Sequence, residues 1–241
     1  MSHTHLDPQR IRAMFGRIAG RYDLANTALS FGIHHRWRKK LVGHAGVQSG
    51  QRVLDLATGT GDLAITFKQA VGPTGEVIGT DFCQEMVEQA RQKVKKMNLD
   101  VRFEEADAMN LPHPDASFDI TSIAFGIRNI ADPVKTMFEM ARVTKPGGVV
   151  AILEFGQPLL PVWKQLYALY AHHIIPRLGG LITGAPWAYR YLEQSSANFP
   201  CRDEFLELMR KTGRLEHPDY WALTGGVAYI YTARSVLPHS T

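Results

Sequence analysis

Hydrophobic and polar positions alternate along the chain in a regular rhythm from residue 51 onward. Short runs rich in β-branched and aromatic residues, which predict strands, alternate with stretches whose apolar residues recur at helical spacing. The expected strands cover 52–57, 76–81, 101–106, 118–125 and 148–155, and the expected helices end at 71 or cover 84–97 and 132–143. This order of elements predicts a mostly parallel, doubly wound α/β sheet with helices on both faces.

The rhythm breaks after residue 155 and resumes beyond residue 200. Residues 158–200 are rich in aromatic residues, proline and glycine, and we expect them to form an inserted helical cap. A helix and two strand-like runs follow, at 202–211, 215–223 and 226–233. The segment Thr224-Gly225-Gly226 is a hairpin signal between these runs. We therefore divide the chain into a core at 51–157, the cap at 158–200 and a C-terminal segment at 201–241 that completes the sheet with an antiparallel strand.

Residues 1–50 predict a helical arm. Asp7 is a plausible helix cap with Pro8 in the first turn, and apolar residues then recur at helical spacing, at Ile11, Met14, Phe15, Ile18, Ala19 and Tyr22. The chain has a net charge of +4, but the arm alone carries eight basic and two acidic residues, so the rest is slightly acidic. Two interpretations remain open: the arm packs on its own domain with a solvated basic face, or it serves as a lid or membrane contact.

Composition excludes several classes of protein. Apolar residues make up 45% of the chain and charged residues 21%, which is typical of a folded globular protein. Cys83 and Cys201 are too few for a disulfide scaffold or a Cys/His zinc site, so we expect no metal and a reducing compartment. No apolar signal segment and no run of about 20 apolar residues is present. We expect a cytoplasmic protein.

A glycine-rich turn follows the first strand, Asp55-Leu56-Ala57-Thr58-Gly59-Thr60-Gly61-Asp62. Such a turn lets a ligand approach the backbone closely. A dinucleotide fingerprint would need glycine at 57, 59 and 62, and a carboxylate at 62 would compete with a pyrophosphate for the helix N-terminus. No Lys-Ser/Thr pair follows, so the turn is not a Walker loop. The turn favours a cofactor without phosphate, and we expect S-adenosylmethionine.

Three acidic residues, Asp55, Asp81 and Asp107, stand at or near the ends of three successive strands. Each alone is most often a cap or a turn former, but together they lie where open α/β sheets bind ligands. We expect Asp81 to accept the ribose hydroxyls. We expect Asp107 to accept the adenine amine, with the amide of Ala108 nearby.

At this point the chain resembles a known family. The glycine turn, Asp81, Leu111-Pro112 through Phe118-Asp119 and Lys145-Pro146-Gly147-Gly148 are similar to the motifs of Rossmann-like class I S-adenosylmethionine-dependent methyltransferases. Other segments resemble the quinone C-methyltransferases, which methylate the ring of menaquinone and ubiquinone precursors. These segments are Met14–Asp23, Leu29–Trp37, Ile123–Asn129, Leu153-Glu154-Phe155 and Tyr191–Pro200. Thr58, His113 and the run Ala228–Tyr231 depart from the pattern.

The resemblance implies roles for particular residues. It places Thr60, Asp81, Asp107, Ala108 and Ala124 at the cofactor, together with Asp55 and the turn residues Gly59 and Gly61. It places Arg128, Asn129 and Tyr22 in the reaction chamber. We expect Arg128 to stabilise a phenolate, because an arginine does not serve as a simple base, although it could instead form a surface salt bridge. His34 and His35 are candidate bases, with His35 preferred, or they pack the arm.

The implied substrate is a prenylated hydroquinone, either demethylmenaquinol or the methoxy-polyprenyl-benzoquinol precursor of ubiquinone. The apolar segment 158–190 suits a groove for the prenyl tail or a peripheral contact with the inner face of the membrane, and alternatively a homodimer interface or simple cap. Methylation of another hydrophobic small molecule remains a second interpretation. We expect no nucleic acid partner, because a basic face and an Asn/Asp-Pro-Pro-Tyr-like motif are both missing.

Overall fold

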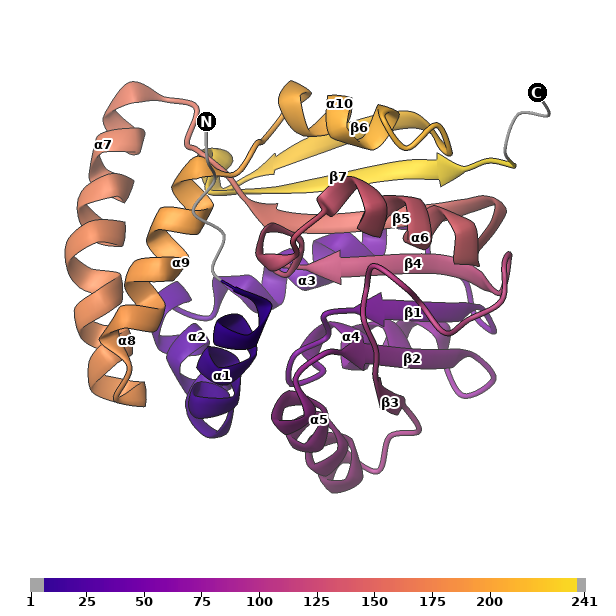
Figure 1. The fold of residues 1–241 in the computed structure, drawn as a ribbon, viewed down its shortest axis with the longest axis horizontal. Helices are drawn as coiled ribbons and strands as arrows, with labels where there is room; N and C mark the ends of the chain where they lie inside the picture. The colour runs from indigo at the N-terminus through magenta and orange to yellow at the C-terminus, as the bar shows by residue number, and fades with distance from the viewer. Residues whose placement is uncertain (1–6, 238–241) are drawn as a thin grey trace.

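A computed structural model describes residues 7–237. The outermost residues of the predicted arm and C-terminal segment, 1–6 and 238–241, lie outside the described residues. Figure 1 shows a twisted sheet covered by helices, with the arm and the cap side by side at one end of it. The boundaries that we placed at 50, 157 and 200 fall in the loops after α3, β5 and α9.

Seven strands form one sheet in the order β3-β2-β1-β4-β5-β7-β6. The strands are β1 (Arg52–Leu56), β2 (Glu76–Asp81), β3 (Arg102–Glu105), β4 (Phe118–Ala124), β5 (Thr144–Phe155), β6 (Leu215–Leu223) and β7 (Ala228–Ser235). Strands β1 to β5 pair in parallel, and β7 runs antiparallel to both of its neighbours. The predicted doubly wound sheet with a C-terminal antiparallel strand is therefore confirmed.

Strand β5 begins earlier than the sequence indicates. We expected a turn at Lys145-Pro146-Gly147-Gly148 and a strand from Gly148, but Thr144 already pairs with Phe118. The register then shifts, and the next pair joins Val149 to Ile120. The predicted turn is thus a bulge inside the strand, which Gly147 permits with a φ of +77°.

Helices cover both faces of the sheet (Figure 1). Apolar residues of α3 (Ile33–His44), α4 (Asp62–Val71) and α5 (Gln84–Met97) share one buried cluster with the strands. Those of α6 (Pro133–Val143) and α10 (Asp203–Arg210) share the other. Because each helix buries one stripe of apolar side chains, the two clusters form the two layers of the core.

The arm consists of α1 (Pro8–Ile18), α2 (Tyr22–Ser30) and α3. Asp7 caps α1 as predicted, since its side chain accepts a hydrogen bond from the backbone N–H of Gln9. The apolar stripe is buried at Ile11, Met14, Ile18 and Ala19. It does not continue as one helix to Tyr22, because a 3-10 turn at Ala19–Arg21 intervenes and Tyr22 begins α2.

The cap is an irregular helical hairpin packed against the arm. It contains α7 (Pro161–Leu169), a π-helical turn (Tyr170–Ile174), α8 (Ile175–Thr183) and α9 (Pro186–Asn198). Tyr189 of α9 shares a buried cluster with Met14 of α1 and Met86 of α5. Arm, cap and core thus meet around one point. None of the helices described between residues 7 and 237 combines the length and apolar character required to cross a bilayer.

Candidate functional site

Two adjoining cavities lie where β1, β2 and β4 end. The central cavity, of about 160 Å³, lies under the arm and the cap. The side cavity, of about 470 Å³, lies beside the ends of β2 and β3. Both are lined by the same seven residues, Phe15, Tyr22, Ala57, Gly59, Ala124, Phe125 and Asn129. A molecule in one cavity would therefore lie directly beside a molecule in the other.

The two glycines of the turn have different tasks. Gly59 has a φ of +57° and faces open space, since a Cβ there would meet only the Tyr22 Cε1 atom, 3.9 Å away. Gly61 lines neither cavity, and a Cβ there would lie 2.8 Å from the Phe103 ring. Gly59 thus leaves room for a ligand, whereas Gly61 allows α4 to pack closely against β3.

Asp81, Asp107 and Ala108 all line the side cavity. The two oxygens of Asp81 accept hydrogen bonds from the backbone N–H groups of Gly59, at 2.8 Å, and Cys83, at 2.9 Å. Burial raises the pKa of Asp81 to about 6. Because a carboxylate offers about four lone-pair sites, Asp81 can still accept hydroxyl donors from a ligand.

Asp55 supports the turn from below. It is 1% exposed and accepts hydrogen bonds from the Thr58 hydroxyl, at 2.6 Å, and the Ser122 hydroxyl, at 2.8 Å. Burial raises the pKa of Asp55 to about 7. Asp55 also borders the central cavity, and its hydrogen bond from the Thr58 hydroxyl holds that part of the turn in place.

A network of charges joins the arm to the glycine turn. The Thr60 hydroxyl donates to Asp23 of α2 at 2.5 Å, and Lys93 of α5 pairs with both Asp23 and Asp62. Burial opposes ionisation of Asp62, but Arg38 and Lys93 outweigh it and lower its pKa. The N-terminal end of α2, where Asp23 lies, is thereby anchored to the glycine turn.

Arg38 of α3 carries an N–H group with spare capacity. Its Nη1 atom lies 3.2 Å from the Asp62 Oδ2 atom but lacks the angles of a hydrogen bond, and it has no other partner in the described part of the chain. The residue is 8% exposed and lines the central cavity. A buried, unsatisfied guanidinium N–H favours an anionic ligand group.

Arg128 is held firmly at the end of the central cavity. It is buried and donates to the Glu154 Oε1 atom, at 2.7 Å, and to the Phe125 backbone oxygen, at 2.6 Å. Its Cζ atom lies 5.3 Å from the centre of the Phe155 ring. Burial raises the pKa of Glu154, against the opposing effect of Arg128. The ion pair is thus an internal one and not the surface salt bridge that we considered.

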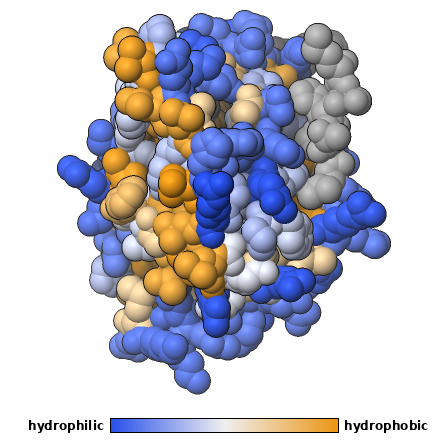
Figure 2. Space-filling view, turned by 90° about the vertical axis from the view of Figure 1, so that its left-hand side faces the viewer, coloured by the Kyte–Doolittle hydropathy of each residue, from blue (hydrophilic) through white to orange (hydrophobic). Residues whose placement is uncertain are grey.

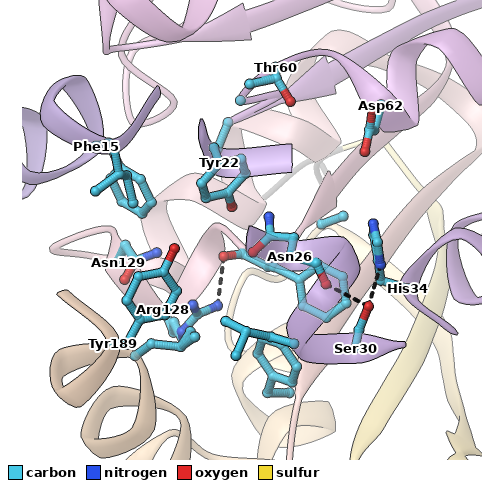
Figure 3. A pocket seen from close by; sticks show the side chains of 18 of the residues that line it. Phe15, Tyr22, Asn26, Ser30, His34, Thr60, Asp62, Arg128, Asn129 and Tyr189 are labelled. Atoms are coloured by element: carbon cyan, nitrogen blue, oxygen red, sulfur yellow. Dashed lines mark hydrogen bonds between the residues drawn. The ribbon is translucent and has the colours of Figure 1, made fainter. Parts of the chain in front are cut away.

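Other polar groups face the cavity beside Arg128 (Figure 3). Tyr22 borders both cavities, and burial raises its pKa, so it remains a protonated donor. The Asn129 Oδ1 atom and the Tyr189 hydroxyl are buried without a hydrogen-bond partner among residues 7–237. The structure therefore brings Tyr22, Asn129 and Arg128 to one cavity. It adds Tyr189, which lies two residues before the Tyr191–Pro200 segment that the sequence singled out.

The two candidate histidines differ sharply. His35 is exposed and lines neither cavity, whereas His34 is buried and lines the central cavity. Ser30 donates its hydroxyl proton to the backbone oxygen of Asn26. Its 2.5 Å contact with the His34 Nδ1 atom therefore requires Nδ1 to be the donor. The Nε2 atom, buried and unpartnered among the described residues, then carries a free lone pair. Burial and the charge of Arg38 lower the pKa of His34 to about 3.

His34, His35 and Asp62 approach one another closely enough to suggest a metal site. Both oxygens of Asp62 already face the cations Arg38 and Lys93. A divalent ion would have to displace these charges, so this grouping does not fit a metal.

Known structures share this fold. A methyltransferase from Aquifex aeolicus, titled as S-adenosylmethionine-dependent, matches with a TM-score of 0.58 at 22% identity, over 83% of this chain and 89% of its own. Phosphoethanolamine N-methyltransferase 2 from Haemonchus contortus, solved with S-adenosylmethionine, matches with a TM-score of 0.61 at 18% identity, over 84% of this chain and 53% of its own. The chain has the Rossmann-like fold of these methyltransferases, as the sequence predicted.

Sequence comparison narrows the class to a family. The pattern of the ubiE/COQ5 methyltransferase family matches residues 3–235. A Bdellovibrio bacteriovorus protein named ubiquinone/menaquinone biosynthesis C-methyltransferase is 55% identical, over 96% of this chain and 98% of that protein. A demethylmenaquinone methyltransferase from Deinococcus radiodurans is 44% identical, over 92% and 91%. The chain belongs to the ubiE/COQ5 methyltransferase family, which confirms the predicted family and enzyme class.

Proposed function

We propose that the protein methylates a ring carbon of a prenylated hydroquinone, with S-adenosylmethionine as the methyl donor. The substrate that we favour is demethylmenaquinol, and the methoxy-polyprenyl-benzoquinol precursor of ubiquinone is a second acceptor. The names of the relatives support this choice. The observation that carries this proposal is that two cavities share one wall. The side cavity is lined by acidic residues, and the central cavity is lined by aromatic rings.

The side cavity and its edge suit the cofactor. Asp81 would accept the ribose hydroxyls, and Asp107 with Ala108 would hold the adenine. Ala124 and Gly59 lie at the shared wall, where the sulfonium would sit. Bound there, S-adenosylmethionine supplies an electrophilic methyl group.

The amino-acid part of the cofactor carries both a carboxylate and an ammonium group, and the opposite charges of the central cavity match it. The free N–H of Arg38 suits the carboxylate, and Thr60 of the glycine turn lines the same cavity. The lone pair on the His34 Nε2 atom would accept from the ammonium group, and the negative charge of Asp62 lies on the same cavity wall without giving up its contacts with Arg38 and Lys93. We do not extend the proposal to His35, because it faces solvent.

The rest of the central cavity suits a flat aromatic ring. The Phe125 and Phe155 rings lie 4.5 Å apart between centres, and the Trp37 ring lies 6.1 Å from Phe125. Phe125 has a left-handed φ of +57°, a conformation that bulky residues avoid. Such strain commonly marks functional sites, and here it places the Phe125 ring in the wall that both cavities share.

Carbon methylation requires the ring carbon to act as a nucleophile. A hydroquinone gains this character when a neighbouring hydroxyl loses its proton, because the phenolate oxygen donates electron density to the ring. The guanidinium of Arg128 would stabilise the phenolate and so lower the pKa of the bound hydroxyl. The proton passes to water, and Tyr22 and Asn129 would orient that water or the ring oxygen. As the new carbon–methyl bond forms, the electron pair of the broken sulfur–methyl bond would stay on sulfur, and S-adenosylhomocysteine would leave. The methylated carbon then gives its hydrogen to water as a proton, and the ring regains aromaticity as a phenolate that is reprotonated.

We also propose that the cap contacts a membrane surface. Figure 2 shows hydrophobic side chains gathered on the face that carries the cap helices. Helix α7 has no buried residue, and large apolar side chains protrude from it and from the loop before it, at Leu159, Leu160, Val162, Leu166 and Leu169. Unpartnered apolar surface of this kind marks an interaction site. A homodimer through the same face is the competing outcome, which sedimentation in the absence of lipid would reveal.

Product analysis tests the proposed reaction. The protein is incubated with S-adenosylmethionine and reduced demethylmenaquinone, and the product is fragmented in a mass spectrometer. We expect the new methyl group on a ring carbon. A methyl ether on the ring oxygen would contradict the mechanism given for Arg128, and an unchanged acceptor would contradict the proposed substrate.

A further inference from the structure

A third hollow lies between the central cavity and the apolar surface of the cap. This surface groove, of about 530 Å³, runs between the turn that joins α2 to α3 and one side of α7. It shares six lining residues with the central cavity, Leu29, Ser30, Trp37, Tyr167, Tyr170 and Val227. The two hollows are therefore adjacent, and a ligand too long for the central cavity would reach the groove past these side chains.

We propose that the surface groove binds the isoprenoid tail of the substrate and leads it out to the lipid surface. This inference rests on the proposed function, because it requires an acceptor with a long apolar chain. The chemistry of the walls suits such a chain, since apolar and aromatic side chains dominate them. Beyond the shared residues, the groove is lined by Ile33, Trp163 and Leu166.

Three of the polar groups in the groove walls already donate hydrogen bonds to other groups of the protein. The Tyr170 hydroxyl donates to the Leu29 backbone oxygen at 2.6 Å, which joins the cap to the arm. The indole N–H of Trp163 donates to the Thr224 backbone oxygen at 3.0 Å, and that of Trp37 donates to the Thr224 hydroxyl at 3.1 Å. With these donors satisfied, the faces of the rings are left for an apolar ligand. The π-helical turn that begins at Tyr170 sets the position of its ring, and such turns are frequent at functional sites.

Phe31 marks the outer end of the groove. It has a left-handed φ of +49° and is 87% exposed, and its ring lies 6.4 Å from the Tyr170 ring. Both features are unfavourable for an isolated protein, since a bulky residue avoids this conformation and an aromatic ring avoids water. Contact between the ring and a tail or lipid chain gives Phe31 a function at this position. Arg36, which also lines the groove, is placed to meet anionic lipid headgroups.

A matched pair of substitutions tests the groove. Leu166 and Leu181 are both exposed leucines of the cap, at 54% and 81%, but only Leu166 lines the groove. We expect Leu166→Asp to raise KM for a detergent-solubilised prenylated naphthoquinol by about tenfold, through lost apolar contact. The KM for a naphthoquinol without a tail stays the same, and Leu181→Asp changes neither value. Equal effects of the two substitutions would overturn the proposal, because general adsorption to the apolar face would then explain them.

Two further measurements do not depend on turnover. Titration with geranylgeraniol should change the tryptophan fluorescence of the native protein, through Trp163 and Trp37, and should do so more weakly in Leu166→Asp. Phe31→Gly should raise Tm, because glycine relieves the backbone strain, and should nevertheless weaken geranylgeraniol binding. Unchanged fluorescence in the native protein, or unchanged binding in both variants, would overturn the groove.

The proposed tail site and the proposed reaction can be contradicted independently of each other. If the native protein methylates tailed and tailless naphthoquinols with the same KM, the reaction stands and the tail site is wrong. If it methylates neither while geranylgeraniol still binds through Leu166, the proposed reaction is wrong and an isoprenoid site remains.

Discussion

Arg128 and Glu154 form an ion pair that is 5% and 1% exposed at the side-chain level. Each depends on the other, because a single charge left alone in the interior is strongly destabilising. Glu154 therefore acts as a positioning residue, which keeps the guanidinium at the end of the central cavity. The sequence predicted Arg128 from its resemblance to a family motif, and Glu154 lay within another motif without an assigned role.

A pair of variants separates the charge of Arg128 from its contribution to stability. Arg128→Met should lower the free energy of unfolding by about 3 kcal/mol, because Glu154 is left without its partner. Adding Glu154→Gln should restore most of that loss, since no buried charge remains, but methyl transfer should stay lower by orders of magnitude. Urea unfolding and transfer of labelled methyl measure the two effects. Activity in the stable double variant would show that the reaction does not need the cation.

The pKa of Asp81 predicts how cofactor affinity depends on pH. Burial raises this pKa to about 6, above the ordinary value of 3.8, so the free protein takes up a proton here as the pH falls through 6. A protonated carboxyl loses acceptor capacity, and the affinity for S-adenosylmethionine should fall by up to about tenfold per pH unit below that point. Calorimetry between about pH 5 and 8, a range that spans the titration of this group, measures this affinity.

Control variants identify the group that titrates. Asp81→Asn should bind weakly at every pH and lose the dependence, whereas Asp100→Asn, at an exposed position, should behave like the native protein. A native affinity that stays constant down to pH 5 would contradict a carboxylate role for Asp81.

The sequence predicted the residues at strand ends better than those that depend on tertiary contacts. Asp81 and Asp107 follow from strand order alone, because parallel strands bring their carboxyl ends to one edge. His34 and His35 are neighbours on one helix, so only the packing of α3 decides which of them is buried. Tyr189 and Arg38 reach the central cavity from the cap and the arm, and no local pattern indicates that.

At the scale of elements, the arm is the part whose structure was hardest to predict from the sequence. One apolar stripe predicted one helix, whereas a 3-10 turn at Ala19–Arg21 redirects the chain before Tyr22. The arm packs on its own domain and also covers both cavities, so the two interpretations that we left open are compatible. Its basic face is only partly free, because Arg12 pairs with Glu105 and Arg21 donates to the Ile182 oxygen.

Asp23 offers a test of the arm as a cover. It is bonded to Thr60 and Lys93 across the boundary between arm and core. Asp23→Asn should loosen this attachment and make the arm more susceptible to limited proteolysis, with a several-fold loss of S-adenosylmethionine affinity. Tm should fall little, since the contact is partly exposed. The Asp100→Asn variant is the control, and equal proteolysis of the two variants would show that the bond does not hold the arm.

At the scale of the whole molecule, the mostly parallel sheet and the helices on both of its faces follow from the sequence rhythm, because each connection type restricts the topology. The exposed cap does not follow from it. Segment 158–190 reads as apolar, and only the structure shows which of its side chains remain uncovered. The charge of the arm and the apolar surface of the cap both support the proposed membrane contact.

Vesicle sedimentation tests that contact. The protein should bind vesicles with anionic lipid, and added salt should weaken the binding because charge contributes to it. Replacing Val162 and Leu169 of α7 by Asp should reduce binding by about tenfold or more, through lost apolar burial. Met97→Asp, which lies outside the cap, is the control. Binding that persists in the α7 variant would show that this face does not contact the lipid.

The most direct test of the proposed function is transfer of a labelled methyl group from S-adenosylmethionine to defined acceptors. Demethylmenaquinone is offered in its reduced and oxidised forms, beside the ubiquinone precursor and total RNA. We expect label in the reduced quinols, none in the oxidised quinone, which has no hydroxyl to ionise, and none in RNA. Label in RNA with none in either quinol would contradict it.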